Sequence, residues 1–350
     1  TERTRYDPND ETLPKRTMYI GANEMQIQEV DHVSGVETNI TYWVLPEEDF
    51  GGLIRRTTIT NINQRHSLTL GVLDGLTRME PSGGKINARL KNERQTLQGF
   101  MRVDQTYQDT LSMPFYRLSR DTKEGEGAFM GEGETSQHET GNFVIALLEG
   151  QESTDGDYGT PLLPIMFDTN KVFGQDTLLL HPRELHTKTI SDIVNGSQYS
   201  DARTPSAFAA LEDITLEPGE TVSIASVYGR TKKALDIPVI ARRVTRDGFV
   251  DFKFSRAREM IKQITAKVDT KTSSLLFDKY VQQSYLQNSL RGGIPQIMGD
   301  VHTADDGTII MGEGMTTTDE DERLRVYHLF SRSSGDMFRD SLEFELDPTF

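Results

Sequence analysis

The stretch GFVDFKFSRAREMIKQITAKV, residues 248–268, contains the change of periodicity on which our prediction of the fold depends. Its beginning, GFVDFKF, alternates apolar and polar side chains, which is typical of a β-strand. After Ser255, which we expect to be an N-cap, apolar residues recur at helical spacing. They are Ala257, Met260, Ile261, Ile264 and Val268. We therefore predict that a β domain, residues 1–253, precedes a helical linker, residues 254–273.

Upstream of this stretch, short segments rich in Val, Ile, Thr and aromatic residues alternate with turn residues. Such segments without intervening helices indicate a large antiparallel β-sandwich. We expect a hairpin-type turn at Asp74–Gly75 and another turn at Pro218–Gly219. The segments that we expect to be strands are TNITYWVLP (38–46), LIRRTTITNI (53–62), SLTLGVLDGL (67–76), NFVIALLEG (142–150), LLPIMFD (162–168), DTLLLHP (176–182), TVSIASVYG (221–229), IPVIARRV (237–244) and GFVDFKF (248–254).

A second helix is predicted downstream, in SLLFDKYVQQSYLQNSLRGG, residues 274–293. Its apolar residues share one face, which we expect to pack against another element. These are Leu276, Phe277, Tyr280 and Val281. Gly292–Gly293, followed by Pro295, should end the helix. We expect residues 274–350 to be the beginning of a helical domain that is truncated.

The composition restricts the kinds of partner. The formal net charge is −16, whereas binding to nucleic acid or to an anionic membrane surface requires clustered Lys and Arg. We therefore expect neither partner, and a neutral glycan carries no such penalty. No apolar run approaches the roughly 18 residues of a membrane span. The absence of cysteine excludes disulfides and thiolate chemistry, and it fits a cytoplasmic location.

Catalytic motifs are missing from the sequence. The seven histidines form no compact ligand spacing such as HExxH, and no G-x-S-x-G elbow occurs. The Gly-rich loop at residues 121–141 contains several glutamates that would repel phosphate. Carboxylate pairs of the kind that cleave glycosides are defined by their separation in space, so the sequence cannot select one among 54 acids.

Several longer stretches nevertheless resemble a known family. The chain is similar to the N-terminal part of β-glucan phosphorylases related to cellobiose phosphorylase, and in particular to the β-1,3-glucan phosphorylase-like group. The stretches that carry the resemblance are YIGANEMQIQEVD (19–31), LPEEDFGGLIRRTTITN (45–61), VLDGLTRMEPSGG (72–84), MPFYRLS (113–119), LLPIMFDTNKVFGQDT (162–177), LFDKYVQQSYLQNSLRGGIP (276–295) and RVYHLFSRSSGD (325–336).

This resemblance implies a β-sandwich of the super-sandwich type, then a helical linker, then an (α/α)6 barrel. The barrel carries the general acid, an aspartate, and the phosphate-binding residues, so we expect the catalytic residues beyond Phe350. Phe338-Arg339-Asp340 has the letters of an FRD element that grips the terminal sugar in this superfamily. Arg339 and Asp340 are therefore candidate substrate-binding residues, and the alternative is an ordinary surface pair.

The expected function is accordingly part of an enzyme. The chain would supply the sandwich and one rim of the active site of a phosphorylase that cleaves β-glucan oligosaccharides with inorganic phosphate and releases glucose 1-phosphate. The resemblance implies no metal and no organic cofactor, and a homodimer or association with the rest of the barrel or a second fragment. The alternative is a non-catalytic carbohydrate-binding or structural protein. Trp43, the only tryptophan, lies in a strand pattern and is expected in the core.

Overall fold

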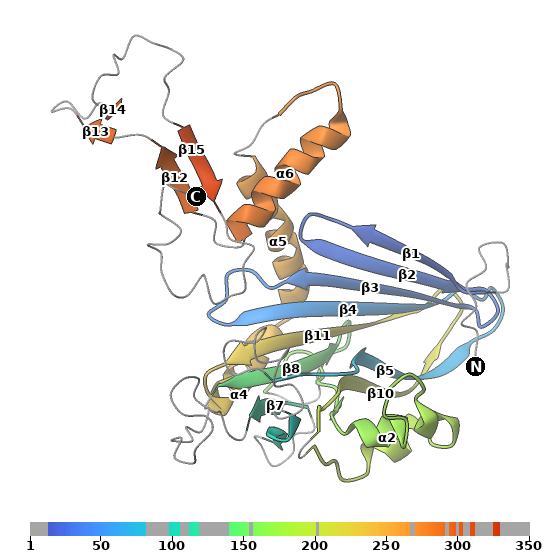
Figure 1. Ribbon diagram of the computed structural model, residues 1–350. Helices are drawn as coiled ribbons and strands as arrows, with labels where there is room; N and C mark the ends of the chain where they lie inside the picture. Colours follow the sequence, from blue (N-terminus) through green and yellow to red (C-terminus); the bar gives the residue numbers. More distant parts are fainter. Residues whose placement is uncertain are drawn as a thin grey trace, which may run out of the picture. The chain divides into compact units, whose positions relative to one another are not determined.

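A computed structural model describes residues 13–81, 98–105, 112–118, 140–153, 157–200, 203–266 and 270–290, together with the backbone of four short strands between residues 294 and 329. The chain divides into two compact units, Thr1–Arg258 and Glu259–Phe350. The boundary between them falls inside a helix, α5 (Phe249–Thr265). Figure 1 shows the elements of both units.

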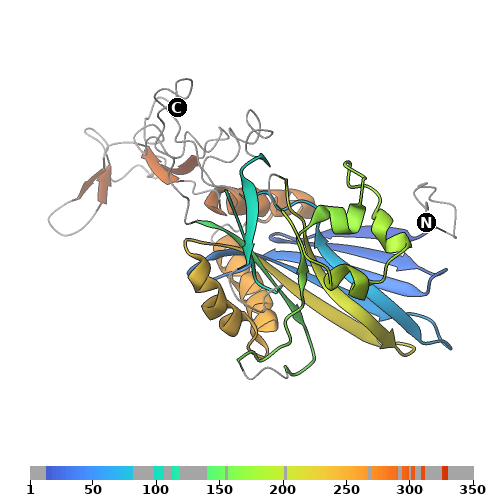
Figure 2. The same ribbon diagram turned by 90° about the horizontal axis from the view of Figure 1, so that it is seen from below.

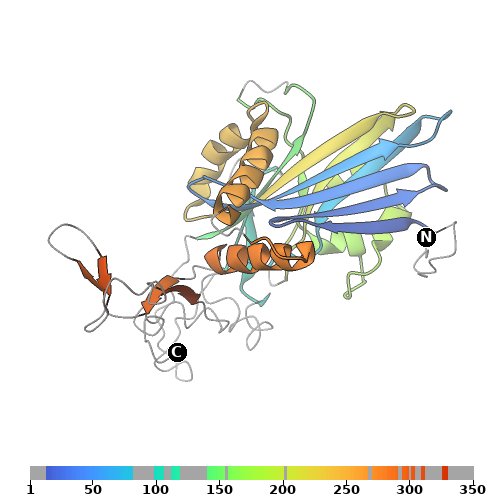
Figure 3. The same ribbon diagram turned by 90° about the horizontal axis from the view of Figure 1, so that it is seen from above.

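The first unit is built on an antiparallel sheet of eight strands in the order β1-β2-β3-β4-β11-β8-β7-β6. Its two longest strands, β4 and β11, pair along nearly their whole length, from Gly51 opposite Arg230 to Thr60 opposite Thr221. Figure 3 shows the first four strands and β11 side by side. The bounds are β1 (Lys15–Ile20), β2 (Glu24–Asp31), β3 (Val36–Val44), β4 (Gly51–Asn61), β6 (Met101–Gln105), β7 (Pro114–Leu118), β8 (Gly141–Leu148) and β11 (Thr221–Thr231).

A second antiparallel sheet has the order β5-β10-β9, from β5 (Leu68–Leu76), β10 (Ala207–Leu216) and β9 (Ile165–Met166). It shares an apolar core with the larger sheet, formed by Ile59 and Ile224 from one and by Ala209 and Leu211 from the other. The first unit is therefore mainly β, as predicted, with two sheets around a common core.

Short helices cover the second sheet on its other side. They are α2 (Thr169–Phe173), η1 (Arg183–His186) and α3 (Ile190–Val194), drawn in green in Figures 1 and 2. Ile190, Ile193 and Val194 of α3 pack on Met166 and Ala210 of the sheet. The α3 helix begins with a capping box, in which the Thr189 and Asp192 side chains each accept a hydrogen bond from the other residue's backbone N–H.

The larger sheet is covered on its other face by helix α4 (Ile237–Val244), by η2 (Ala234–Asp236) and by the first half of α5. Ala225 and Val227 of β11 face this layer, because side chains alternate between the two faces of a strand. They pack with apolar residues of α4, such as Ile240 and Val244, and with Ala257 of α5.

Two segments that we predicted to be strands are helical in the structure. Residues 237–244 form α4, in which the buried Ile237, Ile240, Ala241 and Val244 follow the i, i+3, i+4, i+7 pattern of one helix face. Residues 249–254 belong to α5, which begins at Phe249 and not after Ser255. The apparent alternation in GFVDFKF was misleading because one of its buried residues is the charged Lys253.

Three further local predictions can be compared with the structure. Asp74–Gly75 is not a turn, because both residues continue β5 and pair with Ala209 and Phe208. Residues 176–182 are not a strand and lead into η1. The turn at Pro218–Gly219 is confirmed: it joins β10 to β11, and Gly219 has a φ of +80° that favours glycine.

The second unit contains α6 (Leu275–Leu290), which ends before Gly292–Gly293 as predicted. After it, β12 (Ile294–Met298) pairs with β15 (Arg325–Leu329), and β13 (Val301–Thr303) pairs with β14 (Ile309–Met311). The predicted apolar face of α6 is largely exposed: Leu276 by 81%, Phe277 by 51% and Tyr280 by 67%. Across the part of the chain that is described, no helix has both the length and the apolar character that a membrane crossing demands.

Candidate functional site

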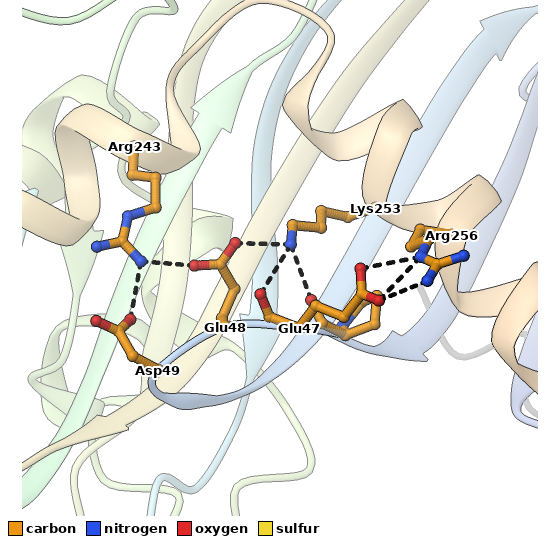
Figure 4. A network of polar contacts seen from close by, with 7 residues as sticks. Glu47, Glu48, Asp49, Arg243, Lys253 and Arg256 are labelled. Atoms are coloured by element: carbon orange, nitrogen blue, oxygen red, sulfur yellow. Dashed lines mark hydrogen bonds and ion pairs between the residues drawn. The ribbon is translucent and has the colours of Figure 1, made fainter.

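The segment Leu45–Phe50, which connects β3 to β4, carries three consecutive acids, Glu47, Glu48 and Asp49. Each acid meets a basic residue of α4 or α5 (Figure 4). The backbone here is unusual, because Glu47 has a φ of +54°, a value that residues other than glycine rarely adopt. We call Glu47, Glu48, Asp49, Arg243, Lys253 and Arg256 the junction network.

Glu48 and Lys253 form the centre of the junction network. Lys253 Nζ lies 2.7 Å from Glu48 Oε1 and also donates to the backbone carbonyls of Pro46, at 2.9 Å, and Glu47, at 3.3 Å. These three partners match the three donors of an ammonium group. The second oxygen of Glu48 accepts from Arg243 Nη1 at 2.7 Å. The buried lysine is therefore fully satisfied by groups from one connecting segment.

Two outer ion pairs complete the junction network. Arg243 Nη1 also donates to Asp49 Oδ1 at 2.8 Å. Arg256 grips the Glu47 carboxylate with two nitrogens, Nε at 2.9–3.0 Å and Nη2 at 2.7 Å. A forked contact of this kind fixes orientation as well as distance. Both helices of this layer are thus attached to the same short segment.

The charges of the junction network hold its acids ionised. Burial alone would raise the pKa of Glu48, but the hydrogen bonds from Lys253 and Arg243 outweigh burial, so the pKa lies below its ordinary value. Hydrogen bonds from Arg256 and Arg243 lower the pKa of Glu47 and of Asp49 in the same way. A general acid at neutral pH needs a raised pKa. These three carboxylates are therefore suited to holding the helices and not to donating protons.

A column of aromatic and arginine side chains attaches α5 to the sheet beside this network. Trp43, which is 2% exposed, contacts Phe254 with 4.6 Å between ring centroids. Arg258 stacks on the Phe254 ring, with its Cζ 4.1 Å from the ring centroid, and also binds Glu24 of β2 through two nitrogens. Cation–π and aromatic contacts each contribute of the order of 1 kcal/mol. The first half of α5 is therefore fixed on the sheet at several points.

A third polar group lies between the two sheets. Arg55 of β4 donates to Asp74 of β5 through Nε, at 3.0 and 3.2 Å, and through Nη2 at 2.5 Å. Thr57 Oγ1 donates to the same carboxylate at 2.9 Å, and Tyr42 Oη is a further partner of Arg55. Both charged side chains are at least nine-tenths buried. This pair joins the two sheets through their shared core and leaves its carboxylate inaccessible to a substrate.

The structure places only some of the candidate residues from the sequence analysis. Arg339 and Asp340 are outside the described residues, so the structure does not place them. His32, His66, His181 and His186 are exposed, and within the described ranges no cluster of three or more His, Asp or Glu side chains could hold a metal ion. Sequence reasoning missed the junction network, although three consecutive acids after Leu-Pro and the polar face of residues 237–244 were signals of it.

No family model matches the sequence, and no curated protein matches it either. The interpretation of the site therefore depends on its geometry and on the residues themselves. Arg55, Asp74 and the acids of the junction network all have charged partners, and these partners connect strands to strands or strands to helices. The arrangement can hold a helical segment against a β-sheet, and it presents no pair of free carboxylates for acid–base chemistry.

Proposed function

We propose that this chain supplies the non-catalytic β-sandwich, the helical linker and the beginning of the (α/α)6 barrel of a glycoside phosphorylase. The enzyme would cleave β-glucan oligosaccharides with inorganic phosphate and release glucose 1-phosphate. On this proposal the general acid and the phosphate-binding residues belong to the barrel. The sandwich contributes one rim of the active site, and no metal or organic cofactor takes part.

One observation carries the proposal: stretches that resemble the phosphorylases meet one another in the fold. Arg55 belongs to LPEEDFGGLIRRTTITN and Asp74 to VLDGLTRMEPSGG, and these two residues form the buried pair between the sheets. The acids of the junction network come from the first of these stretches as well. Residues in the stretches that resemble the phosphorylases thus connect one sheet to the other and the larger sheet to the helices. Such connections are what a supporting domain requires.

The order of the elements also supports the proposal. Mainly β structure up to Thr231 is followed by α4, α5 and α6, which agrees with the sandwich and the helical linker that the resemblance implies, and four short strands follow α6. In an inverting phosphorolysis, an acid protonates the glycosidic oxygen while phosphate attacks the opposite face of the sugar. Acids held ionised by arginine and lysine cannot supply that proton, so the chemistry is assigned to the barrel.

A complementation assay tests this function. The 350-residue chain is mixed with the barrel of a β-1,3-glucan phosphorylase that lacks its own sandwich, together with laminari-oligosaccharides and phosphate. We expect no glucose 1-phosphate from either part alone and release from the mixture. The Lys253→Met variant should complement poorly, whereas Lys262→Met, at an exposed position of the same helix, should complement like the parent.

Two results of this assay would contradict the proposal. Release of glucose 1-phosphate by the isolated chain would show that a catalytic acid lies within it. No complex between the chain and the barrel, measured by light scattering, would remove the supporting role.

The carbohydrate-binding alternative has one observation in its favour, which is that Tyr199 is 74% exposed and could stack on a sugar ring. Trp43 is unsuitable for this purpose because it is buried against Phe254. Titration calorimetry of the chain with laminari- and cello-oligosaccharides distinguishes the two functions. Binding that Tyr199→Ala abolishes would favour the alternative.

A further inference from the structure

Two hydroxyl groups on β11 point into the core between the sheets. Ser226 and Tyr228 are two residues apart and therefore lie on the same face of the strand. Ser226 is 0% exposed and Tyr228 is 7% exposed. Neither Ser226 Oγ nor Tyr228 Oη has a hydrogen-bond partner within 3.5 Å among the described residues, and the influence of Ser226 on the pKa of Tyr228 is that of a neighbouring hydroxyl beyond this distance.

The neighbours of these hydroxyls are polar on one side. Ser226 lies opposite Arg55 on β4 and opposite Ala146 on β8. Arg55 in turn holds the Asp74 carboxylate, which comes from the other sheet. Among the described residues, Asp74 Oδ2 accepts a hydrogen bond only from Arg55 Nε, so it retains capacity for a further donor.

The protonation state of Tyr228 makes it a donor. Burial raises the pKa of its hydroxyl, and the charge of Asp74 raises this pKa further, whereas the Arg55 charge and the Ser226 hydroxyl lower it. The net direction is upward, so the group keeps its proton at neutral pH. Ser226 and Tyr228 share one face of β11, and Ser226 lies opposite Arg55, so both hydroxyls face the side of the sheet on which Arg55 binds Asp74.

A direct bond between the two hydroxyls would leave one proton without an acceptor, because each group is a single donor. Leaving a buried donor unpaired costs roughly 1–3 kcal/mol, and buried polar groups in native proteins are almost always paired. A water molecule removes this problem, since it can accept from one hydroxyl, bond the other and donate to a carboxylate. Buried waters usually have two to four such partners.

We propose that one structural water molecule binds between the sheets next to Arg55 and Asp74, held by Ser226 Oγ and Tyr228 Oη, with Asp74 as its third partner. An anion is a poorer occupant, because the Asp74 carboxylate already neutralises Arg55 and would repel a second negative charge. The water extends the contact between the sheets from an ion pair to a continuous hydrogen-bonded group.

The test uses the intact 350-residue chain and compares each substitution at the proposed site with the same substitution at a control position. Ser226→Ala, Tyr228→Phe and their double variant remove the proposed water ligands. Ser206→Ala and Tyr116→Phe remove hydroxyls of the same kinds whose partners are protein carbonyls, at 3.1 and 3.0 Å. Oxygen-17 relaxation dispersion, which detects long-lived internal water, is measured on each together with urea unfolding.

We expect the Ser226/Tyr228 double variant to lose one long-lived water, while the Ser206 and Tyr116 variants lose none. Each single variant at Ser226 or Tyr228 should lower the folding equilibrium constant about three- to tenfold. A rise in that constant would mean that the hydroxyls were unsatisfied, and it would overturn the proposal. A fall without loss of the long-lived water would mean a direct bond and would overturn it too.

A variant that fails to fold does not leave the question open. A crystal structure of the parent chain then decides, because the proposal requires an ordered water within hydrogen-bond distance of both Ser226 Oγ and Tyr228 Oη. The two oxygens in direct contact, or the space filled only by apolar atoms, would be the contrary result.

Discussion

Lys253 on α5 and Glu48 in the connection between β3 and β4 form a buried ion pair of 2.7 Å, with each side chain only 7% exposed. The two residues are far apart in the sequence, and their contact attaches the first half of α5 to the connection between β3 and β4. Removal of one partner from such a pair leaves a charge that is neither solvated nor neutralised.

Lys253→Met should therefore destabilise the chain strongly. The variant leaves the Pro46 and Glu47 carbonyls without their donor and leaves Glu48 with Arg243 as its one remaining cation. We expect a loss of about 3 kcal/mol in the free energy of unfolding, measured by urea denaturation. Lys262→Met, on the exposed side of α5, should change it by no more than about 0.5 kcal/mol. Equal effects of the two substitutions would contradict the central role of Lys253.

Acid should weaken the junction network before it affects the apolar core. The pKa values of Glu47, Glu48 and Asp49 are lower in the folded chain than their ordinary values of 4.5, 4.5 and 3.8. A carboxyl of this kind contributes stability above its unfolded pKa, and the contribution disappears as the pH falls through the folded pKa.

Thermal melting between pH 7 and pH 3 measures this effect. The melting temperature of the parent should fall below about pH 4.5, and the fall should be smaller in a Glu48→Gln variant because that position no longer titrates. A parent and variant with the same pH profile would show that the network does not couple to folding.

The Arg55–Asp74 pair allows a prediction that compares the loss of one charged partner with the replacement of both by apolar residues. Arg55→Met or Asp74→Leu alone should each cost about 3–5 kcal/mol, because the remaining charge stays buried. The double variant should recover most of this loss, since two apolar side chains suit the space between the sheets. The exposed pair Arg16–Glu29 provides the comparison, and its coupling energy should not exceed about 1 kcal/mol. Additive losses at Arg55 and Asp74 would contradict their pairing.

Trp43 reports on the attachment of α5 because it is the only tryptophan and lies against Phe254. We expect blue-shifted emission and weak quenching by acrylamide in the parent chain. Phe254→Ala should increase the quenching and cost about 2 kcal/mol or more. Phe252→Ala, at a 62% exposed position two residues away, should do neither. Strong quenching in the parent would show that Trp43 is accessible to solvent.

Local pattern was sufficient for much of the fold. The alternation in residues 221–229, the glycine after Pro218 and the Gly-Gly-Pro end of α6 correctly predicted a strand, a turn and a helix end. These features depend on side-chain spacing and on backbone conformations that few residues adopt, and both are visible in a short window of sequence.

Where local pattern failed, tertiary contacts had overridden it. Residues 248–254 look like a strand, yet residues 249–254 form the first turns of α5, where Lys253 finds three oxygen acceptors in the connection between β3 and β4. Gly75 has the signature of a turn, yet β5 continues through it because Phe208 on β10 supplies a pairing partner.

The sequence by itself determined the mainly β character of the described residues up to Thr231, the helical character of residues 255–265 and of α6, and the absence of a compact catalytic or metal-binding motif from the sequence. Only the tertiary structure decided which charges meet: Glu48 with Lys253, and Asp74 with Arg55. The physical reason is that periodicity arises between neighbours in the chain, whereas the pairing of a buried charge or hydroxyl depends on groups that folding brings together from distant segments.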